Sequence, residues 1–169
     1  MSFLTRSFLV IITLVLAAIF AEATPAVGDK SVYDVTLTKG SQVVTGQVSF
    51  ELTAFDKDGN SWTQVSTTEF NGQTQTQTDK VEAKDLLDDT TIDTILGDCL
   101  SRGGQSENIQ SPAGEFPSCA IPVNNAKGSG TVWVAKVPFG FVKWISHRRD
   151  GITVEGLLKN FQTGTLPSP

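Results

Sequence analysis

Turn-forming dipeptides divide most of this chain into short segments. Asp58-Gly59, Asn71-Gly72 and Asp150-Gly151 each lie between runs of residues that favour strands. These dipeptides favour the positive φ angles of two-residue type I′ hairpin turns, whose twist matches the strands that they join. Lys39-Gly40 and Gly128-Ser129-Gly130 predict further turns. The chain is therefore expected to form mainly antiparallel strands that follow one another in sequence.

The segments between these turns alternate apolar and polar residues. From Val44 to Ala54 every second residue is apolar or small, and Tyr33, Val35 and Leu37 alternate in the same way. Successive strand residues project to opposite faces, so the pattern predicts a sheet with one buried face. The segment 74–78 contains only Thr and Gln, which favours a solvated edge strand, with disorder as the alternative.

One segment, Lys84–Cys99, has helical periodicity. Its apolar residues recur at spacings of about three and four, and aspartates near its start suit a helix N-terminus. It predicts one helix, or a pair of short turns, packed on the concave face of the sheet. Later strands are expected at 105–111, 115–123, 131–137, 141–148 and 152–161, with a β-bulge at Gly156. The predicted fold class is mostly β (α+β): a curved antiparallel sheet or half-barrel packed on one helix.

The N-terminal segment is typical of a secretory signal. Arg6 precedes the uncharged run Phe8–Phe20, and small residues, Ala21 and Ala23, lie just before the expected cleavage site. We expect residues 1–23 to be removed and residues 24–169 to form a single β-rich domain in the periplasm or outside the cell. An uncleaved signal that acts as an anchor is the alternative. Because no second apolar run approaches membrane-spanning length, the mature protein is expected to be soluble and not to span a membrane.

The net negative charge of the chain argues against two classes of partner. The net charge is −5 and the pI is about 4.8, whereas nucleic-acid binding requires clustered Lys and Arg. Nucleic acid is therefore not expected as a partner, and unaided adhesion to anionic lipid surfaces is disfavoured.

The chain has two cysteines, Cys99 and Cys119. In an exported protein with no third cysteine, the simplest expectation is that they form a disulfide. The loop that they close has about twenty residues, which corresponds to roughly 3 kcal/mol of stabilisation. A metal or nucleophile pair is the alternative, but the single histidine, His147, is distant in sequence.

Two further motifs invite a chemical interpretation. Asp56–Asn60 resembles the start of a calcium loop, but its glycine falls at the wrong position, so a hairpin turn is favoured. His147 could act as a general base only beside a nucleophile, and the sequence contains no Gly-x-Ser-x-Gly motif that would supply a nucleophilic serine. No catalytic residue, metal ligand or cofactor is predicted. The basic cluster of Lys143, His147, Arg148 and Arg149 is expected to be a solvated face, or else to meet an anionic head group or a partner.

Aromatic residues concentrate in the last third of the chain, at Trp133, Phe139, Phe141 and Trp144. They would either fill a core or line an apolar ligand cavity inside a curved sheet. For the cavity, the expected wall residues are Val48, Phe50, Leu52, Trp133 and Trp144, with Ile92 and Leu96 on the helix as a lid or plug.

Several motifs in the second half of the chain resemble a group of exported bacterial β-rich proteins. A PAG-x-F-x-x-C hairpin ends at Cys119, a tryptophan strand follows at Val132–Val134, and a VP-x-G-x-V-K turn covers Val137–Lys143. The resemblance spans Cys99–Phe161 and implies a half-barrel broadly similar to periplasmic lipoprotein carriers. It brings no catalytic residues, and likeness at the level of fold does not establish function.

The expected function is that of an exported, soluble, non-enzymatic domain that binds an apolar small molecule, a lipid or an envelope protein. A structural or adhesive envelope protein without a cavity is the alternative, and a hydrolase is the third option. An apolar cavity would favour the first, a filled core with an exposed apolar patch the second, and a buried, perturbed titratable cluster the third.

Overall fold

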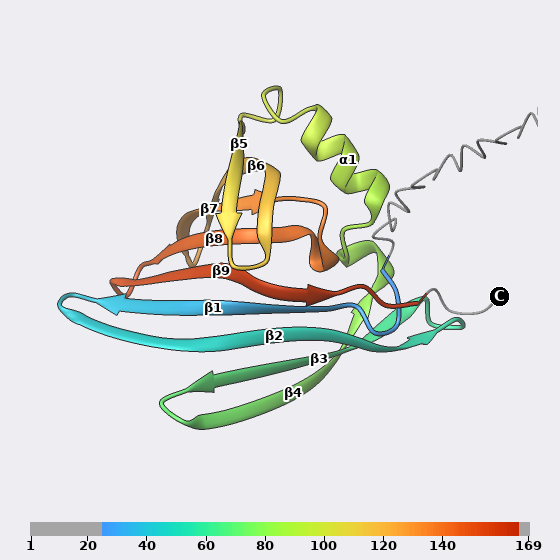
Figure 1. Ribbon diagram of the computed structural model, residues 1–169, viewed down its shortest axis with the longest axis horizontal. Coiled ribbons are helices and arrows are strands. Elements are labelled where there is room, and N and C mark those ends of the chain that lie inside the picture. The colour runs from blue at the N-terminus through green and yellow to red at the C-terminus, as the bar shows by residue number, and fades with distance from the viewer. Residues whose placement is uncertain (1–24, 166–169) are drawn as a thin grey trace, which may run out of the picture.

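The computed structural model describes residues 25–165, and the predicted signal peptide, residues 1–23, lies outside the described residues. Within them, nine antiparallel strands form one curved, open sheet in the order β4-β3-β2-β1-β9-β8-β7-β6-β5 (Figure 1). The strands are β1 (Lys30–Lys39), β2 (Gln42–Asp56), β3 (Ser61–Phe70), β4 (Gln73–Glu82), β5 (Gln105–Ser111), β6 (Gly114–Asn125), β7 (Gly128–Val134), β8 (Phe141–Arg148) and β9 (Ile152–Gln162). The predicted fold class is confirmed.

The helical segment is shorter than its apolar pattern. Residues Ala83–Asp85 form a single 3₁₀ turn, η1, and the α-helix α1 spans Asp89–Gly97. The Asp88 carboxylate accepts a hydrogen bond from the backbone N–H of Thr91 (2.7 Å), which caps the helix at its N-terminus. The helix contacts β6 and β7 and lies above the sheet, beside the β5–β6 hairpin (Figure 1).

A disulfide joins Cys99 and Cys119, as predicted, with their Cα atoms 5.7 Å apart. Both cysteines are buried. The bridge ties the turn that follows α1 to β6.

The three turns predicted at Asp-Gly and Asn-Gly dipeptides lie where expected, but two of their three predicted turn types are wrong. The turn predicted at Gly128–Gly130 is wrong in position, because these residues begin β7 and the turn itself is Ala126–Lys127. Asn71 and Gly72 have φ angles of 52° and 72° in a two-residue loop between β3 and β4, as in a type I′ turn. The other two loops are longer, and in each of them an aspartate side chain binds the turn backbone. The carboxylate of Asp56 accepts a hydrogen bond from the N–H of Gly59, and that of Asp150 accepts one from the N–H of Ile152; both hydrogen bonds are 3.2 Å long.

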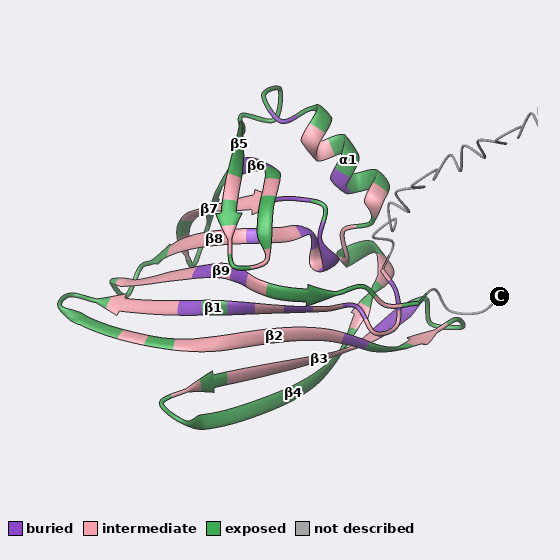
Figure 2. Ribbon diagram, viewed as in Figure 1, coloured by how far each residue is buried: buried purple, intermediate pink, exposed green. Residues whose placement is uncertain are grey.

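Buried residues concentrate in the middle of the sheet. The main core cluster consists of Tyr33, Val35, Ala135, Val137, Val142 and Leu158. By contrast, the edge strand β4 is exposed along nearly its whole length (Figure 2), so the Thr-Gln segment is the solvated edge strand that the sequence favours. The β5–β6 hairpin folds back until β5 contacts β8 and β9, and the rings of Phe116 and Phe161 lie 6.1 Å apart.

Asp29 holds the two ends of the described chain together. Its carboxylate accepts hydrogen bonds from the N–H groups of Ala26 and Gly164, each 2.7 Å long. Burial raises the pKa of this carboxyl, while the two backbone hydrogen bonds act in the opposite direction. Among residues 25–165, no helix has the length and apolarity needed to cross a membrane.

Candidate functional site

The strand register separates the side chains of β7, β8 and β9 onto two faces. Trp144 pairs with Val132 and Gly156, whereas the next residue, Lys143, pairs with Trp133 and Leu157. Directly paired residues share a face and successive residues alternate. We call the face that carries Trp144 and Val132 the inner face, and the face that carries Trp133 the outer face.

The inner face contains an apolar pocket of about 480 Å³. Its walls come from both halves of the sheet and from the two connections that cross its end. The lining residues are Tyr33, Phe50, Gln64, Val81, Asp85, Leu86, Leu87, Val132, Phe139, Phe141 and Trp144. Only Gln64 and Asp85 among them bring an amide or a carboxylate.

Tyr33 lies at the centre of the aromatic wall. Its ring meets Trp144 edge-on with 4.7 Å between centroids and meets Phe50 at 6.1 Å. The hydroxyl donates to the backbone carbonyl of Phe141 (2.9 Å), and burial raises the pKa of the phenol. The polar end of Tyr33 is therefore bonded to protein backbone, and its apolar ring faces the pocket.

Gly156 makes room for the Trp144 indole. A Cβ atom at this position would lie 2.1 Å from Cζ2 of Trp144, well inside van der Waals contact. The bulge predicted at Gly156 is wrong, because Gly156 pairs regularly with both Val35 and Trp144. The register shift of β9 lies further on, opposite Val32 and Tyr33.

Phe139 enters the pocket from a tight turn, η2 (Pro138–Gly140). Gly140 N–H donates to the carbonyl of Val137 (2.8 Å), and Phe139 has φ 65° and ψ −1°. With proline before it, this is the geometry of a type II turn, in which the residue at that position is usually glycine. The buried Ser31 hydroxyl fixes the turn by donating to the carbonyl of Pro138 (2.9 Å). An aromatic side chain is thus held in a conformation that costs on the order of 1 kcal/mol.

The connection from β4 to α1 closes one end of the pocket. Leu86 and Leu87 line the pocket and also a small adjoining cavity of about 10 Å³ that reaches Leu52 and Asp29. A Cβ atom at Gly140 would lie 2.7 Å from Cδ1 of Leu87, so this connection packs closely on the η2 turn.

The structure brings two of the seven predicted wall and lid residues, Phe50 and Trp144, to the pocket. Val48 is half-buried on the inner face but does not line the pocket. Leu52 is buried beyond the Leu86–Leu87 connection. Of the two helix residues, Ile92 is fully buried near Gly140 and Leu96 is half-buried, and neither lines the pocket.

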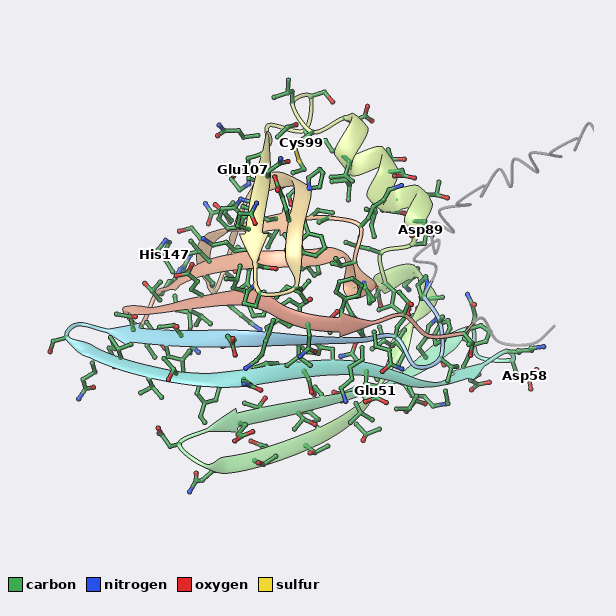
Figure 3. The ribbon with its side chains drawn as sticks, viewed as in Figure 1. Glu51, Asp58, Asp89, Cys99, Glu107 and His147 are labelled. Carbon is green, nitrogen blue, oxygen red and sulfur yellow. A yellow bond between two sulfur atoms is a disulfide. The ribbon has the colours of Figure 1, made fainter. Side chains whose placement is uncertain are left out.

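Trp133 lies on the opposite side of the sheet from Trp144, where it packs against the hydrophobic core cluster and also has polar partners. Its Nε1–H donates to Glu107 Oε1 on β5 (2.7 Å), and the ammonium of Lys143 lies 5.1 Å from its ring centroid. Lys143 also pairs with Glu155 (3.1 Å). Figure 3 shows Glu107 on β5 and His147 at the far end of β8.

Sequence reasoning missed Tyr33, Val81, Leu86 and Leu87 as wall residues. The alternation around Tyr33 did place it on a buried face, but which strands pair across that face is not visible in one sequence. Leu86 and Leu87 lie in a connection, where periodicity carries no information about position.

No family model and no curated protein matches the sequence. Solved structures similar to it include a Bacteroides fragilis protein described as exported with a YmcC-like fold (12% identity, TM-score 0.43, covering 80% of this chain and 95% of that chain). Another is the Pseudomonas aeruginosa MucA/MucB complex (11%, 0.42, 82% and 53%), so this chain spans about half the length of the matched chain. A third is a Vibrio parahaemolyticus domain described as an outer membrane lipoprotein-sorting protein (7%, 0.30, 86% and 89%).

Proposed function

We propose that this chain is an exported, non-enzymatic domain that binds an apolar ligand, such as a lipid acyl chain, in the inner-face pocket. The observation that carries the proposal is the aromatic wall around about 480 Å³ of open volume. Small-molecule sites are typically concave, of about 300–1,000 Å³, and mostly apolar with few polar groups. The pocket has this size and this composition.

Burial of apolar surface would favour a ligand in the pocket. Phe50, Val132, Phe139 and Trp144 are only half-buried in the protein alone. Apolar surface removed from water contributes about 25 cal/mol per Å², so an apolar chain that covers these side chains would gain affinity without any polar contact.

The two rival functions find less support. A structural envelope protein was expected to have a filled core, whereas the inner face is hollowed. A hydrolase would need a nucleophile and a base within hydrogen-bond reach, and the residues that line the pocket include no Ser, Cys or His. The buried carboxylate of Asp29 binds backbone N–H groups at the chain ends.

Binding of the fluorescent apolar probe N-phenyl-1-naphthylamine tests the proposal. The probe should bind saturably with micromolar affinity, on the order of 8 kcal/mol, and be displaced by fatty acids. Trp144→Ala should weaken this binding about tenfold or more, as expected when an anchor residue is truncated.

The matched control is Trp133→Ala, which removes the same side chain from the outer face and should leave probe affinity unchanged. Because Trp144→Ala also removes packing against Tyr33, Val132→Phe provides a second variant that fills the pocket instead of emptying it. Non-saturable binding, or equal loss in both tryptophan variants, would contradict the proposal and favour an envelope protein partner or a structural role.

A further inference from the structure

A second hollow, of about 640 Å³, lies where the β6–β7 turn meets the β8–β9 turn. Lys127, Arg148 and Arg149 line it, together with a single carboxylate, Asp150. The backbone N–H of Arg149 donates to the carbonyl of Lys127 (3.2 Å), which joins the two turns. This hollow is therefore lined by more cations than carboxylates on a protein whose net charge is −5.

Two of these cations are available to a ligand. The Arg148 guanidinium already pairs with Asp150 (2.8 Å). The side chains of Lys127 and Arg149 form no ion pair within residues 25–165, and both residues are exposed. His147, one residue before Arg148, faces the other way and lies 3.1 Å from the Thr153 hydroxyl.

The basic hollow and the apolar pocket lie on the same face of the same strands. Along β8, Trp144, Ser146 and Arg148 alternate onto the inner face, where they pair with Val132, Gly130 and Gly128 of β7. The first of these pairs lines the apolar pocket, and the third lines the basic hollow.

Between the two hollows, few side chains rise from the inner face of β7 and β8. Gly130 and Gly128 carry no side chain, and a Cβ atom at either would lie within 2.2 Å of a backbone oxygen of β8. Only the small Ser146 projects from β8 in this interval. The four residue-to-residue steps from Trp144 to Arg148 span about 13 Å of strand, so a ligand that reaches both ends must be elongated.

We infer that the ligand is an anionic amphiphile, whose apolar chain occupies the pocket beside Trp144 and whose carboxylate or phosphate head is bound by Lys127 and Arg149. This inference rests on the proposed function and adds the class and orientation of the ligand. The charge of the hollow complements an anionic head, and the continuous inner face connects it to the apolar walls.

The experiment compares three amphiphiles with the same twelve-carbon chain: dodecanoate, dodecyl phosphate and the uncharged glycerol monoester of dodecanoic acid. Each amphiphile is tested for displacement of bound N-phenyl-1-naphthylamine, at concentrations below the critical micelle concentration of that amphiphile. At low salt the two anions should bind about tenfold more tightly than the ester, and the preference should shrink as salt is added.

The double variant Lys127→Gln/Arg149→Gln should reduce that preference to about twofold, since it removes two partly screened charge contacts, and should not change affinity for the ester. Arg102→Gln removes an exposed cation from the turn after α1 and is the matched control. If all three amphiphiles bind equally well, or if the preference survives in the double variant, the head-group site is wrong while the proposed function stands. If none binds saturably, both fail.

Orientation is read independently on the unmodified protein with spin-labelled stearates. A label near the carboxyl group should broaden backbone amide NMR signals of Gly128 and Gly130, and a label near the methyl end should broaden those of Val81 and Leu87. The reverse pattern would overturn the inferred orientation even if binding is tight.

Discussion

Trp133 and Trp144 lie on neighbouring strands, yet their surroundings differ in kind. On the outer face, Trp133 is hydrogen-bonded to Glu107 and covered by the Lys143 ammonium. On the inner face, Trp144 lies over Gly156, meets Tyr33 edge-on and borders open volume. The difference teaches that aromatic content alone does not locate a ligand site. The side on which polar partners are absent and space remains is the candidate.

The largest expected effect is a loss of stability that leaves the ligand site unchanged. Cys119→Ser should lower the free energy of unfolding by about 2–4 kcal/mol, because the bridge closes a loop with a sequence separation of 20 residues. Probe affinity of the folded variant should not change, since neither cysteine lines the pocket. Chemical denaturation measures the free energy of unfolding, and Cys99→Ser, which breaks the same bridge, is the matched variant for comparison. A loss below about 1 kcal/mol would show that the bridge contributes little.

A second prediction sharpens the contrast at Trp144. Gly156→Ala should push the indole into the pocket, because the new Cβ cannot coexist with the present ring position. Probe affinity should fall about tenfold, and stability should fall by about 1–3 kcal/mol from overpacking. Gly97→Ala, at a helix position with open space around it, is the control and should leave affinity intact. Unchanged affinity in Gly156→Ala would mean that Trp144 does not bound the ligand.

A third prediction concerns Phe139. Phe139→Gly and Phe139→Ala both remove the ring, but only the glycine variant relieves the positive φ of 65°. The glycine variant should therefore be more stable than the alanine variant by about 1 kcal/mol, while both lose probe affinity to a similar extent. Equal stability of the two variants would argue against backbone strain in this turn.

The smallest expected effect falls on the outer face. Glu107→Gln weakens the charge-assisted hydrogen bond from Trp133 and should cost about 0.5–1 kcal/mol at this exposed position. Probe affinity should be unchanged. A fall in affinity would break the comparison, because it would couple the outer face to the site.

Much of the fold could be predicted because its signals are local. Alternation around Tyr33 and Val48, turn residues such as Asn71-Gly72 and the isolated pair of cysteines each report on nearby structure. Strand limits at Gln105–Ser111 and Phe141–Arg148 agree with the structure. These features depend on residues close in sequence or on pairing without a competitor.

The site was less accessible because it depends on register. A shift of one residue in pairing would exchange Trp133 and Trp144 between faces, and the sequence does not fix that choice. Glycine was also misread: Gly128, Gly130 and Gly156 looked like turn or bulge residues, but all three lie within strands, where a Cβ atom would collide with a neighbour.

The most direct test of the account uses single-tryptophan variants and a fatty acid brominated near its methyl end. One variant keeps Trp144 (Trp62→Phe/Trp133→Phe), and the other keeps Trp133 (Trp62→Phe/Trp144→Phe). The heavy atom quenches only a nearby indole, so fluorescence of the Trp144 variant should be quenched saturably and that of the Trp133 variant should not. Quenching of Trp133 alone, or of neither, would contradict a ligand site on the inner face.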